Sequence, residues 1–202
     1  MTRASHAAAL GLGLASGLSR LCDRATAERP AGAPVFWTLG ANQSGKAAIA
    51  AWRDMLLPGL TVGGLRLWPF EGPFLSLLTP GHVAMAETYP AEALRHLGLT
   101  LRGSKRRQAD RAALAAPRAA AIAQLGARAR AGMEAALRDG FGPDAPGEDR
   151  FDSVLGLLCV INVLNGGRPD HAPDDIWLTT WEGWVLGQTA LPADPSTRSR
   201  AA

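Results

Sequence analysis

The sequence has little cysteine and no long apolar run, and these two absences argue against a zinc-stabilised protein and a membrane-spanning protein. Cys22 and Cys159 stand far apart and form no CxxC or Cys/His grouping, which argues against structural zinc and favours reduced thiols in a cytoplasm. The best apolar run, Val154–Leu164, suits a buried helix, because a membrane span takes about 20 residues. The Ala/Leu/Gly run after Arg3 has no convincing cleavage site, so we expect a cytoplasmic protein without a secretory signal.

The composition is that of a globular protein, with 47% hydrophobic and 19% charged residues in 202. This length predicts one domain over residues 1–190, followed by a disordered tail over residues 191–202. The formal charge of +3 and the pI near 9.4 permit an acidic partner, such as nucleic acid or a phosphorylated ligand, but do not require one.

Strand-like and helical patterns alternate along the chain, which predicts an α/β layered fold. Short strands are expected over residues 35–39, 65–70, 82–87 and parts of 175–188. Helices are expected over Ala7–Ala25, Lys46–Leu57, from Pro90, over Lys105–Arg138 and over Phe151–Leu164. Pro58 should stop the second of these helices and Pro117 should break or kink the fourth. The sequence Asn165-Gly166-Gly167 should end the last one.

One loop resembles a phosphate-binding loop. "GANQSGKA", Gly40–Ala47, fits G-x-x-x-x-G-K between a predicted strand and a predicted helix, where backbone N–H groups can surround an anion. Ala47 replaces the Ser or Thr whose hydroxyl would hold Mg²⁺. Three interpretations stay open: a nucleotide-hydrolysing site, a phosphate-contacting loop without hydrolysis, and a plain glycine turn beside an exposed Lys46.

Four carboxylates stand at the ends of predicted elements. Glu87 ends a strand, where parallel sheets place functional groups, or it caps the helix that follows. Asp149 is placed as an N-cap of the late apolar helix. Asp152 lies inside that helix and should face an opening in the core, while Glu182 faces a groove or sits on an exposed turn.

Carboxylates that converge from separate elements would bind hard divalent cations, and the expected ions are Mg²⁺ or Mn²⁺. A pair of such ions stabilises the attacking and leaving oxygens in phosphodiester hydrolysis. The basic run Arg102–Arg111 could attract a nucleic-acid backbone, or it could be an ordinary solvated helix surface.

Several phrases together resemble a known family, the predicted nucleases of ribonuclease-H-like fold in domain-of-unknown-function family 429. They are "FWTLGANQSGKAAIAAWR", "AETYPAEALRHLGL", "SKRRQADR", "EDRFDSVLGLL" and "EGWVLGQ", in that order between Ala7 and Gln188. The resemblance implies a mixed sheet flanked by helices, with acidic residues that bind divalent metal for nucleic-acid cleavage.

The resemblance also implies roles for individual residues. Glu87 matches the strand-end acid in E-x-Y-P, Asp152 the aspartate that opens the late helix, and Glu182 the acid of E-G-W. Glu87 and Asp152 would be metal ligands, with Glu182 an accessory catalytic acid. The residues expected to contact phosphate are Asn42, Gln43, Lys46, Lys105 and Arg106, of which the first three match an N-Q-x-G-K loop without an assigned role.

The chain departs from the family at its beginning. Proteins of this fold start with a strand that carries a central aspartate, and no such strand precedes Val35. We expect either a start upstream of Met1 or a relative that has lost the first acid. Three functions follow: a metal-dependent nuclease lacking one principal ligand, a P-loop-like nucleotide binder at Gly40–Ala47, or a non-enzymatic module that binds nucleic acid or protein.

Overall fold

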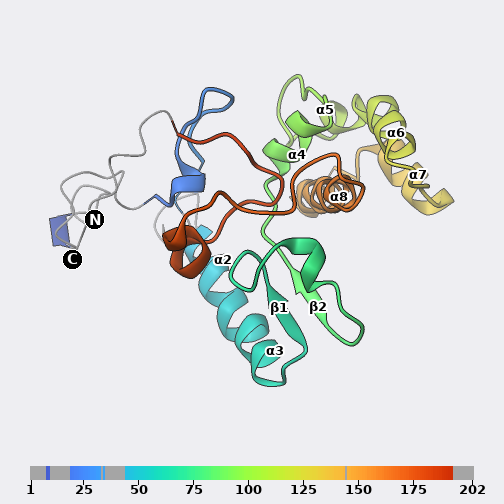
Figure 1. The fold of residues 1–202 in the computed structure, drawn as a ribbon. Helices are drawn as coiled ribbons and strands as arrows, with labels where there is room; N and C mark the ends of the chain where they lie inside the picture. Colours follow the sequence, from blue (N-terminus) through green and yellow to red (C-terminus); the bar gives the residue numbers. More distant parts are fainter. Residues whose placement is uncertain (1–7, 10–18, 33, 35–43, 144, 193–202) are drawn as a thin grey trace. The chain divides into compact units, whose positions relative to one another are not determined.

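The computed structural model describes residues 8–9, 19–32, 34, 44–143 and 145–192, which form a mixed α/β protein (Figure 1). Its sheet has two parallel strands, β1 (Leu65–Leu67) and β2 (Val83–Met85), with Leu65 opposite Val83 and Leu67 opposite Met85. The predicted α/β class is confirmed at this level. The finer expectation, a ribonuclease-H-like mixed sheet, stays a prediction.

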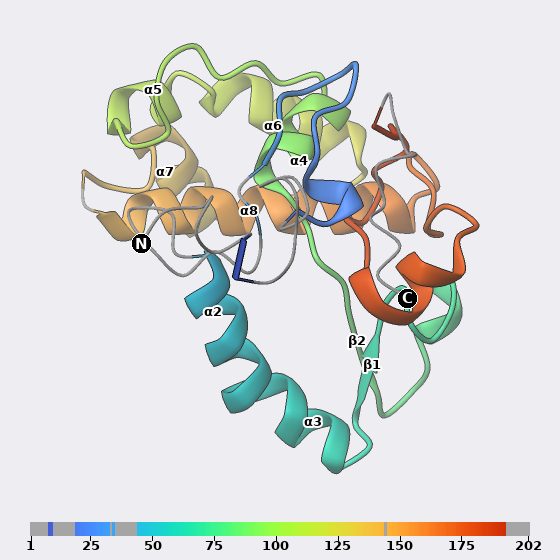
Figure 2. The ribbon, with the colours of Figure 1, turned by 90° about the vertical axis from the view of Figure 1, so that its left-hand side faces the viewer.

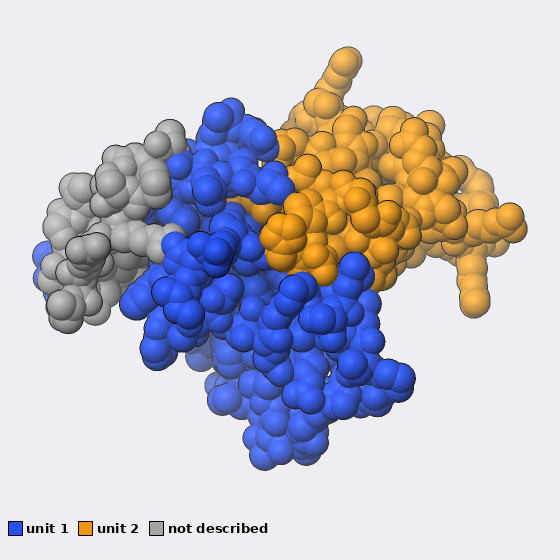
Figure 3. Space-filling model, viewed as in Figure 1, with its two compact units in different colours: residues 1–85, 172–184, 189–202 blue, residues 86–171, 185–188 orange. Residues whose placement is uncertain are grey.

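The chain divides into two compact units, each built from separate stretches of sequence (Figure 3). Unit 1 comprises residues 1–85, 172–184 and 189–202, and unit 2 comprises residues 86–171 and 185–188. The single domain expected over residues 1–190 stays a prediction. Most of the predicted tail, and most of the predicted helix Ala7–Ala25, lie outside the described residues, as does the predicted strand 35–39.

Unit 1 carries the two strands and a helix that passes through a proline. The helix consists of α2 (Ser44–Ala51), a π-helical turn η3 (Trp52–Leu56) and α3 (Leu57–Thr61), which Figure 2 shows in line. The predicted stop at Pro58 is therefore wrong. Pro58 lies in the first turn of α3, directly after a turn whose longer-range hydrogen bonds widen the helix where a proline has no N–H to donate.

Short helical turns complete unit 1. They are η2 (Leu21–Asp23), η4 (Phe74–Leu77) and η5 (Leu178–Glu182). The expected strand residues over 175–188 are thus wrong for their first part, where η5 is a π-helical turn. Only Val185 shows strand-like pairing, through an isolated parallel bridge to Glu87 within unit 2.

Unit 2 is helical, with α4 (Pro90–His96), α5 (Gln108–Ala112), α6 (Ala115–Gln124), α7 (Ala131–Asp139) and α8 (Ala145–Leu164). Pro90 occupies the first turn of α4, as predicted. The helical span expected over Lys105–Arg138, with a break or kink at Pro117, is divided into three helices. The first interruption, between α5 and α6, directly precedes the turn that carries Pro117, which agrees with the predicted break because Pro117 has no N–H to donate to the preceding turn. The second interruption was not predicted: Gly126, at φ 68°, follows the end of α6.

Helix α8 is the central element of the unit 2 core, and α4 packs against it (Figure 1). Its buried side chains include Phe151, Leu155 and Leu158. The end of α8 is as predicted: the N–H groups of Gly166 and Gly167 donate to the carbonyls of Val163 and Asn162, which satisfies the last turn.

Two arginines lie inside unit 2, each with a fully buried side chain. Arg118 donates to the carbonyls of Leu114, Arg111 and Leu137, and its guanidinium lies 5.1 Å from the ring centre of Phe141 and 4.9 Å from that of Phe151. The second, Arg111, donates to the carbonyls of Gly140, Lys105 and Gly142. Arg111 was included in a basic run expected at the surface, and its side chain instead joins α5 to the loop after α7.

No helix in the described part of the chain is both long enough and apolar enough to cross a membrane, in agreement with the sequence.

Candidate functional site

Asp152 is the predicted ligand for which the structure shows the most developed surroundings. It lies on α8, which begins at Ala145 rather than at Phe151, so Glu148 is one helical turn before it on the same face. Lys105, in the loop before α5, reaches both carboxylates: its Nζ is 2.5 Å from Asp152 Oδ2 and 3.2 Å from Glu148 Oε1. We call Glu148, Asp152 and Lys105 the α8 carboxylate site.

The same helix start corrects the interpretation of Asp149. Because α8 begins four residues earlier, Asp149 lies inside the helix and is not its N-cap. Its charge still acts on the site, where it and Glu148 raise the pKa of Asp152.

Burial dominates the electrostatics of the site. It raises the pKa of Asp152 above its usual value, although the hydrogen bond and charge of Lys105 oppose this. For Lys105, burial would lower the pKa, but the hydrogen bonds and charges of Asp152 and Glu148 outweigh it and raise the pKa. Asp152 Oδ1 is buried and has no hydrogen-bond partner among the described residues. The site thus holds more negative charge than its lysine neutralises, and one carboxylate oxygen faces no donor.

Glu87 comes close to α8 along the backbone. It follows β2, pairs with Val185 and accepts a hydrogen bond at its carbonyl from Leu186 N–H, at 2.9 Å. The next residue, Thr88, touches α8 so closely that a methyl group at Gly156 would lie 2.8 Å from its hydroxyl oxygen. Gly156 is one turn after Asp152, so Glu87 adjoins the part of α8 that carries the site.

The structure tests the alternative interpretation that Glu87 caps the following helix, α4. The N-cap position of α4 is Tyr89, which forms no side-chain cap. Glu87, two residues earlier and half-buried, therefore does not occupy the cap position.

Glu182 lies in unit 1, with both of its carboxylate oxygens already engaged. Oε2 accepts a hydrogen bond from Leu21 N–H at 2.7 Å, and Oε1 accepts one from Trp177 Nε1–H at 3.1 Å. The carboxylate therefore ties η2 to η5. Its predicted role as an accessory acid stays a prediction, and that role would require it to give up one of these bonds.

The predicted phosphate contacts have different outcomes. Asn42 and Gln43 lie outside the described residues, and so does most of the Gly40–Ala47 loop. Lys46 is exposed in the first turn of α2, and Arg106 is exposed before α5. Lys105, expected to be available for phosphate, is paired with Asp152 and Glu148 instead.

Two carboxylates beside one ammonium can bind a cation, but they are too few ligands for a complete metal site. Among the described residues, no group of three or more His, Cys, Asp or Glu side chains could hold a metal ion. The donors present are nevertheless the oxygen ligands that Mg²⁺ and Mn²⁺ prefer, and the unpaired, buried Oδ1 of Asp152 fits such an ion.

Neither a protein-family model, nor a curated protein, nor a solved structure matches this chain. The resemblance to family 429 therefore stays a prediction, and the site has to be judged on its own geometry.

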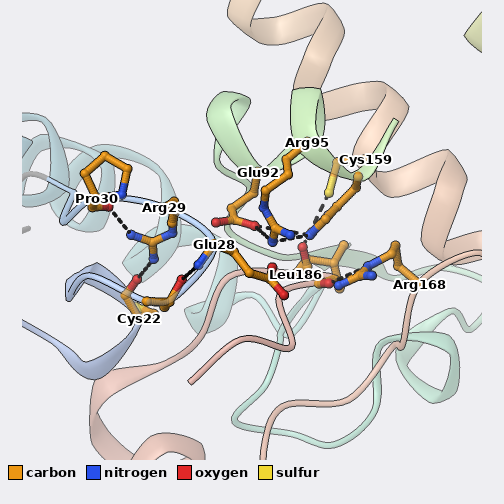
Figure 4. A network of polar contacts seen from close by, with 12 residues as sticks. Cys22, Glu28, Arg29, Pro30, Glu92, Arg95, Cys159, Arg168 and Leu186 are labelled. Carbon is orange, nitrogen blue, oxygen red and sulfur yellow. Dashed lines mark hydrogen bonds and ion pairs between the residues drawn. The ribbon is translucent and has the colours of Figure 1, made fainter. Parts of the chain in front are cut away.

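The sequence analysis missed a second buried cluster, on α4 (Figure 4). Glu92 and His96, one turn apart, each have side chains only 1% exposed, and His96 Nε2 lies 3.1 Å from Glu92 Oε2. Arg95 also donates to Glu92. Burial would raise the pKa of Glu92, but the hydrogen bonds from His96 and Arg95 outweigh it and lower the pKa to about 2. The i, i+4 spacing of an acid and a histidine was the available signal.

The α4 cluster lies beside the segment Val185–Gln188. Cys159 donates its S–H to the carbonyl of Leu186 at 3.4 Å, and Arg168 Nε donates to the carbonyl of Gly187 at 2.9 Å (Figure 4). A methyl group at Gly187 would lie 3.6 Å from His96 Nδ1. Burial raises the pKa of the Cys159 thiol to about 11, so the thiol stays protonated. These contacts hold the segment Val185–Gln188 in place.

Proposed function

We propose that this protein is a divalent-metal-dependent nuclease that uses the α8 carboxylate site, related to the ribonuclease-H-like predicted nucleases of family 429. The observation that carries the proposal is the buried Oδ1 of Asp152, which has no partner among the described residues. Leaving a buried acceptor without a donor costs about 1–3 kcal/mol, and more if it is charged. A bound cation would remove that cost.

The net negative charge of the site favours the binding of a divalent cation. The charges of Glu148 and Asp149 both act on Asp152, and within the described part of the chain Lys105 is the one cation that pairs with Asp152 and Glu148. Three carboxylates against one ammonium leave an excess of negative charge. Mg²⁺ or Mn²⁺ would balance it with the oxygen ligands these ions prefer.

In this proposal, Asp152 and Glu148 hold the ion, and Glu87 adds a carboxylate from the strand end beside α8. When bound, the ion would polarise a phosphoryl oxygen and lower the pKa of water. Lys105 shares its two carboxylates with the ion, so its ammonium becomes available to donate to a phosphate oxygen and to stabilise charge on it. The exposed Arg106 lies next to it in sequence and would contact the backbone of a nucleic acid.

Metal binding can be tested apart from cleavage. Calorimetric titration of the full chain with Mn²⁺ should show binding that Asp152→Asn weakens by about tenfold or more. Lys105→Met should strengthen Mn²⁺ binding, because it removes the competing ammonium. Asp174→Asn, at an exposed position outside the site, is the matched control and should leave binding unchanged.

Cleavage is then measured on single- and double-stranded DNA and RNA, with Mg²⁺, Mn²⁺ or EDTA. We expect cleavage that needs the metal, that Glu87→Gln and Asp152→Asn abolish, and that Asp174→Asn leaves intact. Activity that survives both substitutions, or that is equal in EDTA, would show that another site or a contaminant acts. Absence of Mn²⁺ binding would also refute the proposal.

A further inference from the structure

Unit 2 contains a pocket of about 560 Å³ between α6 and α7. This volume lies within the range of about 300–1,000 Å³ that is typical of small-molecule sites. The pocket shares no residue with the α8 carboxylate site. Its walls are mostly alanine, and they are completed by two larger apolar side chains and three charged ones: Ala115, Ala116, Ala119, Ala123, Ala127, Ala129, Ile122, Leu137, Arg128, Glu134 and Arg138.

The pocket exists because the facing helices lack long apolar side chains. Ile122 and Leu137 belong to the buried core and are 8% and 3% exposed. The other apolar wall residues are all alanines, whose methyl groups cannot fill the space between two helices. Burying apolar surface there would gain about 25 cal/mol per Å², so an aliphatic ligand is favoured over a polar one.

The charged residues of the pocket determine which end of a ligand can be polar. Glu134 and Arg138 pair with each other at 3.3 Å. Arg128 is exposed, and it makes no hydrogen bond or ion pair within the described part of the chain. It lies three residues before α7, whose first turn has no side-chain cap, so the end of that helix adds partial positive charge. An unpaired guanidinium beside an apolar pocket complements an anion, and a carboxylate fits its paired donors.

We propose that this pocket binds an aliphatic carboxylate, with the alkyl chain between α6 and α7 and the carboxylate at Arg128. A chain of about ten carbons fits. If each methylene group takes about 30 Å³, the volume of a water molecule in the liquid, ten of them occupy about 300 Å³. The pocket is a binding site separate from the proposed nuclease chemistry.

Decanoate is the probe, titrated into the full chain by calorimetry, with decanol as the neutral molecule of equal chain length. Saturable binding of one decanoate per chain is expected, tighter than that of decanol. Arg128→Gln should weaken decanoate binding by about tenfold or more, since a charge-assisted hydrogen bond contributes about 1.5–3 kcal/mol, and should leave decanol binding unchanged. Arg102→Gln is the control, at another exposed arginine that has no partner in the described residues.

A second variant fills the space itself. Ala123→Phe places a ring in the pocket from an exposed position, so it should abolish binding of both probes while the far-UV circular dichroism stays native. No saturable decanoate binding by the wild type would overturn the proposal. So would equal binding by wild type and Arg128→Gln. A dimer in sedimentation that Ala123→Phe dissociates, without decanoate binding, would show that a second copy covers the pocket.

Discussion

Glu92 should make the stability of this protein depend on acid in a specific pH range. Its pKa is lowered from 4.5 to about 2, because the hydrogen bonds from His96 and Arg95 outweigh its burial. A shift of that size corresponds to about 3 kcal/mol, at 1.36 kcal/mol per pKa unit. Because the folded pKa is the lower one, this contribution is complete above pH 4.5 and is lost as the pH falls through about 2.

The measurement is urea unfolding of the wild type and of Glu92→Gln, followed by tryptophan fluorescence, from neutral pH down to about pH 2.5. Glutamine cannot ionise, so the variant lacks this titration. The wild type should be more stable by about 3 kcal/mol at neutral pH. That difference should shrink by about 1.4 kcal/mol per pH unit below pH 4.5.

Glu134→Gln is the matched control, because it makes the same chemical change in an exposed i, i+4 pair, with Arg138. Its effect should stay within about 0.5 kcal/mol. If the wild type and Glu92→Gln differ by the same amount at neutral and acid pH, the lowered pKa does not stabilise the fold, and the reasoning is refuted.

Three further substitutions and one labelling reaction test other parts of unit 2. Gly140→Ala should destabilise by more than about 2 kcal/mol, since its Cβ would lie 2.5 Å from the Gln108 carbonyl at φ 74°. Gly166→Ala, at φ 72° with open space, should cost only about 1–2 kcal/mol, and thermal melts of both variants check the contrast. Arg118→Met should cost about 3 kcal/mol in urea unfolding, because it removes three side-chain hydrogen bonds to carbonyls, each with a net value of about 1 kcal/mol; a loss under 1 kcal/mol would contradict this. Folded protein should resist iodoacetamide at Cys159, whose pKa is about 11, and rapid labelling at neutral pH would disprove its burial.

Helix ends that depend on a few neighbouring residues were predicted correctly from the sequence. Pro90 opens α4, and Asn165-Gly166-Gly167 ends α8, because proline and glycine act on the backbone at their own positions. Pro58 shows the limit of such rules, since a preceding π-helical turn lets the helix continue past it.

The position of Asp152 could be predicted from the sequence, but its neighbours could not, for a related reason. Asp152 was recognised as a carboxylate inside a buried helix, which the structure confirms by its half-buried position on α8. Its partners Lys105 and Glu148 were not paired with it in advance. Lys105 is 47 residues away in sequence, and Glu148 precedes the helix that was expected over Phe151–Leu164. The burial of Arg111 and Arg118 escaped prediction because some of their acceptors are carbonyls from distant segments, such as Gly142 and Leu137.

The four residues Val185–Gln188 affect how unit 2 folds during synthesis. They belong to unit 2, whose other residues end at His171, and their backbone is hydrogen-bonded to Glu87, Cys159 and Arg168. During synthesis, the helices of unit 2 leave the ribosome well before this segment does. Unit 2 therefore waits for residue 188 before its contacts are complete, and a fragment cut from the gene as residues 86–171 would leave those polar groups without their native partners.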